Sequence, residues 1–320
     1  MAKFYGTFGP QRFMGSLPAS DTVSYEGVPL VSGIDIGDYT TGVIASLDTG
    51  VGTFGWALGD IYISIENIVG TQHTDTLTGN SLANVLDGGG SPDFIYGRSG
   101  NDTVLGGGGF DFLYGEGGND VMDGQWQTDE MHGGDGHDQM WGGSNFISRY
   151  YPGTDYSDVL YGDAGNDQLH GDVRLPANNG PTEYYQPQDS MPGHDELHGG
   201  SGNDTLNGDG GNDELWGDGG TDTFRFDAPY TVKDSYGSNM RIRSGDDVIH
   251  DFRKGEDRIG LRGYALTDLR IQTSDADGDG AVDDSVIQFD AAGRFTNADS
   301  VVVYNVTGLT SSQSYFVIIA

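Results

Sequence analysis

The run from Gly199 to Asp222 repeats one nine-residue phrase three times, of the form Gly-Gly-x-Gly-x-Asp-x-apolar-x. The half that carries glycine and aspartate favours a tight loop that offers oxygen atoms, because glycine accepts backbone angles that other residues avoid. The other half, with one apolar residue between two others, favours a short strand. One such unit cannot bury its apolar residue alone, so copies must stack. The phrase therefore predicts a parallel coil of short strands and oxygen-rich turns.

The phrase can be followed along the chain by the residue that starts each strand. That residue recurs every nine positions in three blocks: Asp75, Asn84, Asp93, Asp102, Asp111, Asp120, Asp129 and Asp138; Asp158 and Asp167; Asp195, Asp204, Asp213 and Asp222. From 138 to 158 is 20 positions, so eleven residues are inserted there, and from 167 to 195 is 28, so nineteen are inserted. An apolar residue follows two positions after the starting residue, as at Leu77, Ile95, Leu113, Met131, Leu160, Leu197 and Leu215. A solvated linker would not need a regularly spaced apolar residue, whereas a stack of strands buries it. We therefore predict an all-β fold.

The loops predict calcium binding. Two units make one coil, so alternate units lie on the same side of the stack, about 4.8 Å apart. Carboxylates and glycine carbonyls of successive loops then converge, and Ca²⁺ takes six to eight such oxygens at roughly 2.3–2.6 Å. The predicted aspartate ligands are Asp93, Asp102, Asp111, Asp120, Asp129, Asp138, Asp158, Asp167, Asp195, Asp204, Asp213 and Asp222.

A second calcium candidate lies outside the repeats, at Asp275, Asp277, Asp279 and Asp283. These residues follow the spacing of an EF-hand loop, but Val286 stands where that loop has its bidentate glutamate. The alternative interpretation is an acidic β-turn.

Over residues 70–227 the chain resembles the RTX, or hemolysin-type, calcium-binding repeat proteins. The resemblance implies a right-handed parallel β-roll at 71–227 with insertions near 144–157 and 171–194. It also implies an N-terminal β lead-in at 1–70 and a serralysin-like β cap at 228–320. Multiple calcium ions and type I secretion through an uncleaved C-terminal signal, as in Gram-negative bacteria, are implied as well. No His-Glu-x-x-His or Gly-x-Ser-x-Gly motif is present, so neither a zinc protease nor a lipase elbow is expected.

Composition agrees with an extracellular calcium binder. The formal charge is −34, from 49 acidic and 15 basic residues, so the chain repels nucleic acid and anionic membranes and attracts cations. There is no cysteine, and no apolar run is long enough to span a bilayer. Cytosolic calcium is too low to fill weak extracellular-type sites, which favours secretion.

The phase separates two unlike sides of the roll. On the regular side, each strand follows a loop that keeps the glycine-rich pattern of the repeat. These strands start at Asp102, Asp120, Asp138, Asp167, Asp204 and Asp222. On the remodelled side, strands start at Asp93, Asp111, Asp129, Asp158, Asp195 and Asp213, and both insertions emerge there. Residues that flank the buried position on this side point outward and form a stripe of aromatic, histidine and glutamate side chains.

The stripe predicts a ligand cleft for an extracellular, acidic polysaccharide, because flat rings offer stacking surfaces for sugars. The predicted ligand-binding residues are Tyr96, Tyr114, Trp126, Arg149, Tyr150, Tyr151, Tyr184, Tyr185 and Trp216. The alternative is an ordinary strand surface on a non-catalytic calcium-binding surface or matrix protein, or adhesin.

Catalysis is a further alternative. Tyr161, His132 and His198, flanked by Glu130 and Glu196, could move protons next to a uronate carboxylate. That chemistry favours a polysaccharide lyase over a glycoside hydrolase. His132 and His198 are expected about 9.6 Å apart, across two coils.

Overall fold

The computed structural model describes residues 2–5, 11–15, 21–26, 42–143, 145–146, 157–172, 190–191, 193–228, 230–233, 239–242, 245–266, 269–274, 276, 284–289, 299–304, 306, 309 and 315–319. The chain divides into two compact units, Met1–Gln139 and Met140–Ala320. Strand β15 (Gln139–Gly143) carries the boundary.

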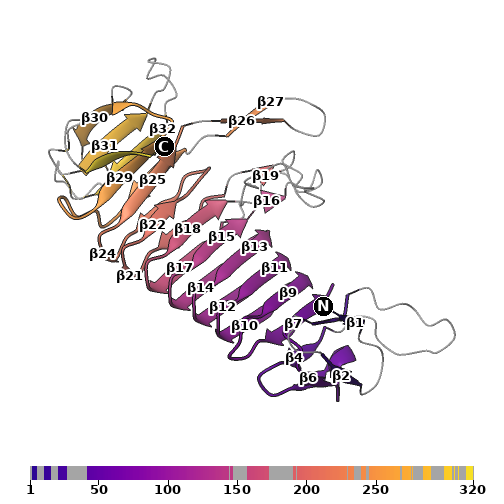
Figure 1. The fold of residues 1–320 in the computed structure, drawn as a ribbon. Helices are drawn as coiled ribbons and strands as arrows, with labels where there is room; N and C mark the ends of the chain where they lie inside the picture. The colour runs from indigo at the N-terminus through magenta and orange to yellow at the C-terminus, as the bar shows by residue number, and fades with distance from the viewer. Residues whose placement is uncertain are drawn as a thin grey trace. The chain divides into compact units, whose positions relative to one another are not determined.

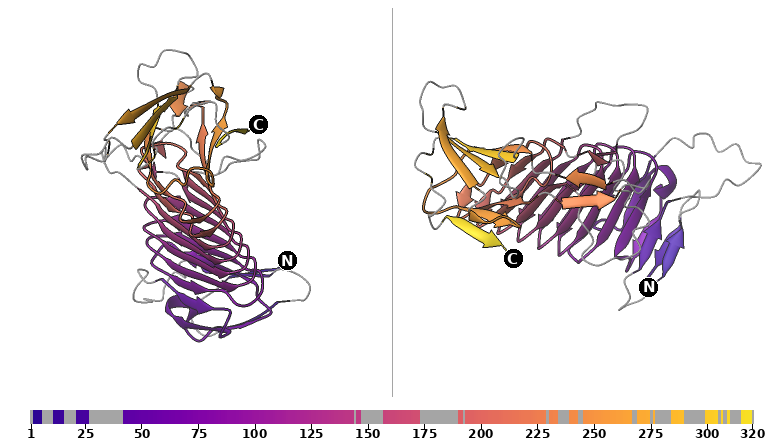
Figure 2. Two further views of the ribbon diagram at one scale, coloured as in Figure 1. Left: turned by 90° about the vertical axis from the view of Figure 1, so that its left-hand side faces the viewer. Right: turned by 90° about the horizontal axis from the view of Figure 1, so that it is seen from above.

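Unit 1 consists of two walls of parallel strands. Within each wall the strands lie side by side, as Figures 1 and 2 show. The regular wall runs in the order β1 (Lys3–Tyr5), β3 (Thr22–Ser24), β7 (Asn67–Thr71), β9 (Val85–Gly90), β11 (Thr103–Gly108) and β13 (Val121–Trp126). The remodelled wall continues parallel from β4 (Ile44–Ser46) through β8 (Thr76–Thr78), β10 (Phe94–Ser99), β12 (Phe112–Gly117) and β14 (Glu130–Asp135).

The first turns of unit 1 depart from the repeat. Strand β2 (Arg12–Met14) pairs parallel with β6 (Ile61–Ile63), whereas β5 (Val51–Phe54) pairs antiparallel with both β4 and β6. One 3-10 turn, η1 (Gly55–Ala57), follows β5.

Unit 2 has the same two walls and then a cap. Its regular wall is β18 (Gln168–Asp172), β22 (Thr205–Asn207), β25 (Thr223–Asp227), β29 (Arg258–Arg262) and β33 (Phe316–Ile319). Its remodelled wall is β17 (Val159–Ala164), β20 (Glu196–His198) with β21 (Ser201–Gly202), β23 (Glu214–Trp216) with β24 (Gly219–Gly220), β28 (Asp246–Ile249) and β32 (Asp299–Val303).

The cap extends the remodelled wall antiparallel through β31 (Asp284–Phe289) and β30 (Leu269–Ser274). Two small antiparallel pairs complete the unit: β16 (Asn145–Phe146) with β19 (Ser190–Met191), and β26 (Tyr230–Lys233) with β27 (Asn239–Ile242). The prediction of an all-β parallel roll with a lead-in and a cap is confirmed.

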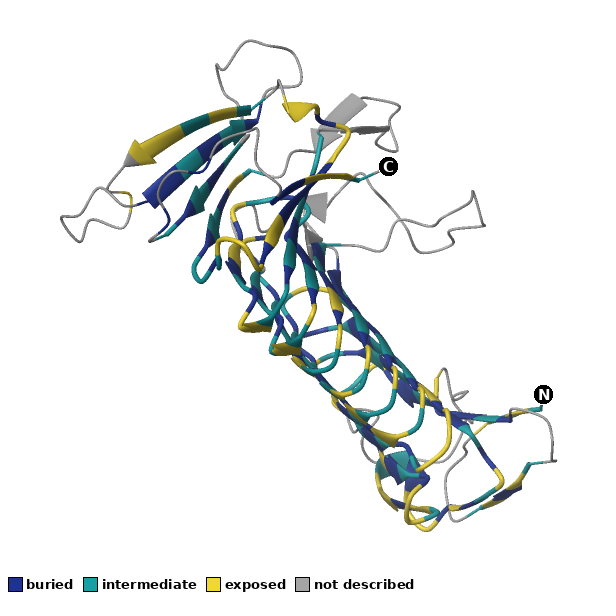
Figure 3. Ribbon diagram, turned by 60° about the vertical axis from the view of Figure 1, so that its left-hand side comes forward, coloured by how far each residue is buried: buried dark blue, intermediate teal, exposed yellow. Residues whose placement is uncertain are grey.

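Each repeat strand buries its central residue completely, and Figure 3 shows the dark blue positions recurring along the strands. Leu113 and Met122 in unit 1, and Leu197 and Leu206 in unit 2, have no exposed surface. The residues on either side of each are less buried, as the alternation along β12 and β20 shows. The core is therefore one side chain wide on each wall. Among the described residues, no helix is long and apolar enough to cross a membrane.

Candidate calcium and ligand-binding sites

A buried aspartate starts the repeat strands of both walls, and one carboxylate oxygen of each holds the backbone of the preceding coil. The backbone N–H of Asp93 donates to Oδ1 of Asp111 at 2.8 Å, and that of Asp102 donates to Oδ1 of Asp120 at 2.7 Å. The same bond joins Asp204 to Asp222 at 3.0 Å. We call each such series an aspartate ladder. All twelve predicted repeat aspartates are buried, with at most 1% of their surface exposed.

The second carboxylate oxygen faces the glycine loop. Examples of Oδ2 atoms that are buried without a hydrogen-bond partner are those of Asp93, Asp102, Asp111, Asp120, Asp204 and Asp213. A Cβ atom built on Gly106 would lie 2.6 Å from Oδ2 of Asp111 and 2.7 Å from the carbonyl oxygen of Gly124. A carboxylate oxygen and a glycine carbonyl of the next coil thus approach the same point. Hard oxygen donors of this kind fit Ca²⁺.

Burial raises the pKa of these carboxyl groups. Loss of solvation is the largest cause, and it raises the pKa of Asp93 to about 9 and those of Asp102 and Asp111 to about 7. For Asp93 the neighbouring carboxylates of Asp75 and Asp111 add to the effect. A divalent cation beside the carboxylates would remove this penalty, because it favours their ionised form.

Side chains alone do not complete a metal site. Within the described part of the chain, no group of three or more His, Cys, Asp or Glu residues could hold a metal ion. The glycine loops also offer backbone carbonyl oxygens as ligands, such as that of Gly124. Asp275, Asp277, Asp279 and Asp283 lie outside the described residues. Their neighbour Asp284 is buried, and its Oδ2 accepts the N–H of Ala276 at 2.6 Å.

On the remodelled wall of unit 1, the outward side chains stack from coil to coil. The ring centroids of Tyr96 and Tyr114 are 5.1 Å apart, and those of Tyr114 and His132 are 5.2 Å apart, with nearly parallel planes. Phe94 stacks on Phe112 at 4.9 Å in the same manner. The register pairs Tyr96 with Tyr114 and Tyr114 with His132, so the stacking follows directly from the repeat.

The remodelled wall of unit 2 carries a longer stack, which we call the unit 2 ladder: Tyr161, His198, Trp216, His250 and Tyr304. Centroid distances along the first four rings are 5.0, 4.5 and 4.0 Å, with interplanar angles of 16°, 9° and 2°. Tyr304 meets His250 edge-on. Each ring in the middle of the stack therefore has both faces covered by its neighbours and presents its edge.

Glutamates pair with the histidines of these stacks. Nε2 of His198 lies 2.9 Å from Oε1 of Glu196, and Nε2 of His132 lies 3.4 Å from Oε1 of Glu130. Glu214 pairs instead with His250 of the following coil. His198, Glu196 and Glu214 are between 22% and 51% exposed, so these polar groups are accessible from solvent.

The structure brings Tyr161, His198 and Glu196 together in unit 2, and His132 and Glu130 together in unit 1. Trp126 ends β13 and is 39% exposed. Arg149, Tyr150, Tyr151, Tyr184 and Tyr185 lie outside the described residues.

Sequence reasoning missed His250 and Tyr304 in the ladder. A signal for His250 was present, since Asp247 followed by Ile249 repeats the pattern of a buried aspartate and an apolar residue two positions later. Asp247 lies 34 residues after Asp213, which is not a multiple of nine, and the search for a nine-residue period therefore did not identify this pattern as a further coil.

A model of the family described as RTX calcium-binding nonapeptide repeat, four copies, matches residues 69–104, 78–113, 96–131, 127–145, 152–173 and 190–224. Among solved structures, the AlgE6R3 subunit of the Azotobacter vinelandii mannuronan C5-epimerase is 24% identical over 60% of this chain and 78% of that one, with a TM-score of 0.30. The extracellular lipase LipA from Serratia marcescens is 16% identical over 77% of this chain and 40% of its own, with a TM-score of 0.21. Comparison with the curated proteins gives no significant match.

The segments that match the family model contain the aspartate ladders and their glycine loops. RTX nonapeptide repeats bind calcium ions, and the buried oxygens of these loops form donor sets that suit this ion. Residues 69–145, 152–173 and 190–224 of the chain are thus RTX calcium-binding nonapeptide repeats.

Proposed function

We propose that this protein is an extracellular, calcium-dependent scaffold that binds a polysaccharide along the unit 2 ladder. The observation that carries the proposal is a row of glutamate and histidine side chains that extends over three successive coils. Glu196 pairs with His198 on one coil, and Glu214 on the next coil pairs with His250 on the coil after it, so each coil step offers a carboxylate or an imidazole. The step is about 4.8 Å, the distance between neighbouring strands, which is close to the length of one monosaccharide.

A linear polymer that lies along these three coils would meet a carboxylate or an imidazole on each of them. Carboxylates and imidazole nitrogens hydrogen-bond to sugar hydroxyls. Because the ring faces of the ladder cover one another, the sugars would contact ring edges and the glutamates rather than stack on the rings. Recognition would thus depend on hydrogen bonding more than the sequence alone suggested.

An extracellular setting supports the proposal. Calcium sites of extracellular modules are weak, with dissociation constants of about 10⁻⁴–10⁻³ M, and fill only where calcium is abundant. We include in the proposal that the chain is secreted by a type I system through its C-terminal segment.

The first test measures binding of neutral and uronate polysaccharides by isothermal titration calorimetry in saturating calcium. His198→Ala is expected to weaken binding about tenfold or more, since it removes one of the repeated polar pairs. The matched control is His170→Ala on the regular wall, where His170 stacks on Trp141 at 5.7 Å and lies 3.0 Å from Asp209. Equal affinity of the two variants, both with unchanged circular dichroism, would refute the proposed face.

A second candidate is a polysaccharide lyase, favoured by one contact. The Tyr161 and His198 rings are 5.0 Å apart, and Glu196 orients the histidine, so a phenol and an imidazole adjoin one carboxylate. If the wild-type protein forms unsaturated sugar products and Tyr161→Phe stops this while binding persists, the lyase is correct. If the wild-type protein binds without turnover, it is a binding scaffold alone.

A further inference from the structure

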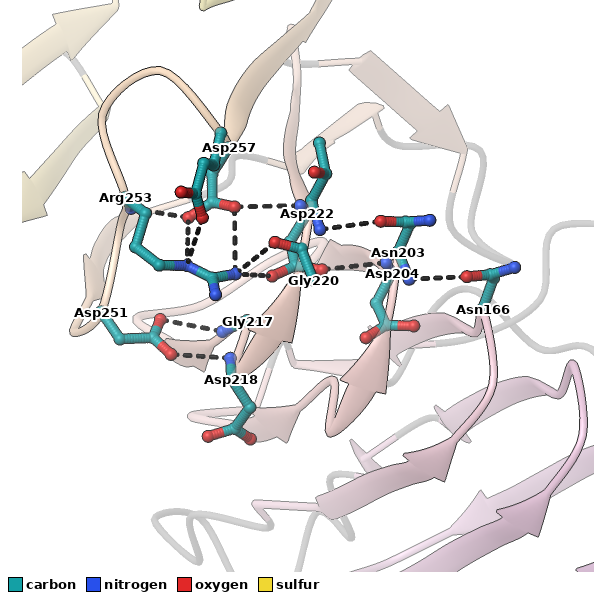
Figure 4. A network of polar contacts seen from close by, with 12 residues as sticks. Asn166, Asn203, Asp204, Gly217, Asp218, Gly220, Asp222, Asp251, Arg253 and Asp257 are labelled. Atoms are coloured by element: carbon teal, nitrogen blue, oxygen red, sulfur yellow. Dashed lines mark hydrogen bonds and ion pairs between the residues drawn. The ribbon is translucent and has the colours of Figure 1, made fainter.

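One aspartate of the regular wall departs from the pattern of its neighbours. Asp204 and Asp213 leave Oδ2 buried without a hydrogen-bond partner, facing the glycine loop. Asp222 starts the last repeat strand, and its Oδ2 lies 2.9 Å from Nη2 of Arg253 (Figure 4). Arg253 lies beyond the repeats, between β28 and β29.

The guanidinium of Arg253 is surrounded by the same oxygen types that face the loops of the earlier coils. Nη2 also donates to the carbonyl oxygen of Gly220 at 2.6 Å and lies 3.3 Å from Oδ1 of Asp257. Asp257 continues the aspartate ladder, since its Oδ1 accepts the N–H of Asp222 at 3.1 Å. A positive charge thus stands between two successive ladder carboxylates and a loop carbonyl (Figure 4).

A tight turn fixes this arrangement locally. The backbone N–H of Arg253 donates to Oδ2 of Asp257 at 2.6 Å, and the N–H of Asp257 donates to the Arg253 carbonyl at 2.9 Å. Gly255 makes the turn with φ of +97°. The side chain of Asp222 is fully buried and that of Arg253 is 37% exposed, so the arginine covers the end of the loop from the solvent side.

The starts of the ladders in unit 1 are also closed by protein groups. Oδ2 of Asp75 accepts the backbone N–H of Thr71 at 2.6 Å and its hydroxyl at 3.1 Å. Asn84 stands where the repeat has aspartate, and its amide bonds to Asn80 and Glu66, each at 2.7 Å. These ends therefore need no added ion, in contrast to the loops between them.

We propose that the guanidinium of Arg253 takes the place of a calcium ion at the Gly220–Asp222 loop. This loop then adopts its folded conformation without calcium. It forms an ordered end of the roll, on which the calcium-dependent coils of unit 2 stack. A planar guanidinium suits the role, because it donates to several oxygens at once and stays charged at any physiological pH.

The test compares the full-length protein with Arg253→Gln, which keeps most of the side chain and removes the charge. Bound calcium is counted by equilibrium dialysis, and the unfolding equilibrium is measured with urea at several calcium concentrations. We expect Arg253→Gln to bind one more calcium ion per chain and to unfold with an equilibrium constant about tenfold larger at fixed calcium, since charge-assisted bonds are lost. Wild-type values for both quantities would overturn the proposal.

Two further variants isolate the charge. Arg262→Gln is the matched control, since the side chain of Arg262 is 55% exposed and its contact with Asp227 is long, at 3.5 Å. This substitution should change neither the number of bound calcium ions nor the unfolding equilibrium constant. Arg253→Lys keeps a positive charge and should bind the wild-type number of ions with intermediate stability. If Arg253→Gln does not fold, folding of Arg253→Lys with wild-type stoichiometry still supports the proposal. An extra calcium ion in Arg253→Lys, or its failure to fold, contradicts it.

Discussion

Two adjacent glycines in one loop of unit 1 have opposite surroundings. Gly118 has φ of +137°, and a Cβ atom on it would lie 1.5 Å from the carbonyl oxygen of Gly100 in the previous coil. At Gly117 the nearest atom to such a Cβ is the carbonyl oxygen of Arg98, at 3.9 Å. Close stacking of the loops therefore requires glycine at position 118 and tolerates alanine at position 117.

This contrast gives a prediction for single residues. Gly118→Ala should lower the free energy of unfolding in saturating calcium by about 2–4 kcal/mol, because both the backbone angle and the contact oppose a side chain. Gly117→Ala should change it by less than about 0.5 kcal/mol. Urea denaturation of the two variants checks this. Equal losses would mean that the loops do not stack as closely as the structure shows.

Single-residue roles were only partly predictable. The nine-residue period located twelve of the buried aspartates, because a repeat with a single apolar position fits the sequence in only one phase. It did not reveal that Oδ1 of each holds the backbone of the preceding coil, since that bond depends on the spacing of stacked loops. Arg253 was not predictable either. Its role arises from a turn outside the repeat that brings it to Asp222.

At the level of strands, the register confirms the larger insertion. Neighbouring strands of the roll pair residues 18 positions apart, as Phe94 pairs with Phe112. Val159 pairs with Glu196, 37 positions away, and 37 less 18 is the nineteen inserted residues. The pairing, and hence which side chains share a wall, could be predicted from the period. The rotamers that turn the rings face to face could not, because they depend on packing between neighbours.

The aspartate ladders also give a prediction for the calcium-free protein. In the folded roll, burial raises the pKa of Asp93 to about 9 and that of Asp204 to about 7, whereas an unfolded aspartate ionises near 3.9. Stability from these groups is therefore complete below about pH 4, where the unfolded aspartates are also protonated, and is lost progressively as the pH rises to about 7–9. Without calcium, acidification from about pH 8 to about pH 5 should increase the β-sheet signal in circular dichroism.

A double variant provides the control for this experiment. Asp93→Asn with Asp102→Asn replaces two titrating groups by neutral amides and should weaken the pH dependence. A calcium-free protein whose β-sheet signal stays the same or falls on acidification would contradict the burial of ionisable carboxyl groups in the ladders.

At the scale of the whole molecule, the charge and the thin core point to the same dependence. The chain carries a formal charge of −34, and most of the described repeat strands bury a single apolar side chain. Carboxylates stacked about 4.8 Å apart repel one another unless cations lie between them. On this account calcium is part of the folded structure, and the unit 2 ladder forms only where calcium holds the coils together.

Far-UV circular dichroism during calcium titration tests this account most directly. The calcium-free protein at neutral pH should give a largely unfolded spectrum, and added calcium should convert it cooperatively to a β-sheet spectrum that chelator reverses, because ions bind the folded state alone. Magnesium at the same concentration should be far less effective, since it binds poorly to irregular all-oxygen loops. A full β-sheet spectrum that persists in chelator, with no change on adding calcium, would contradict the account.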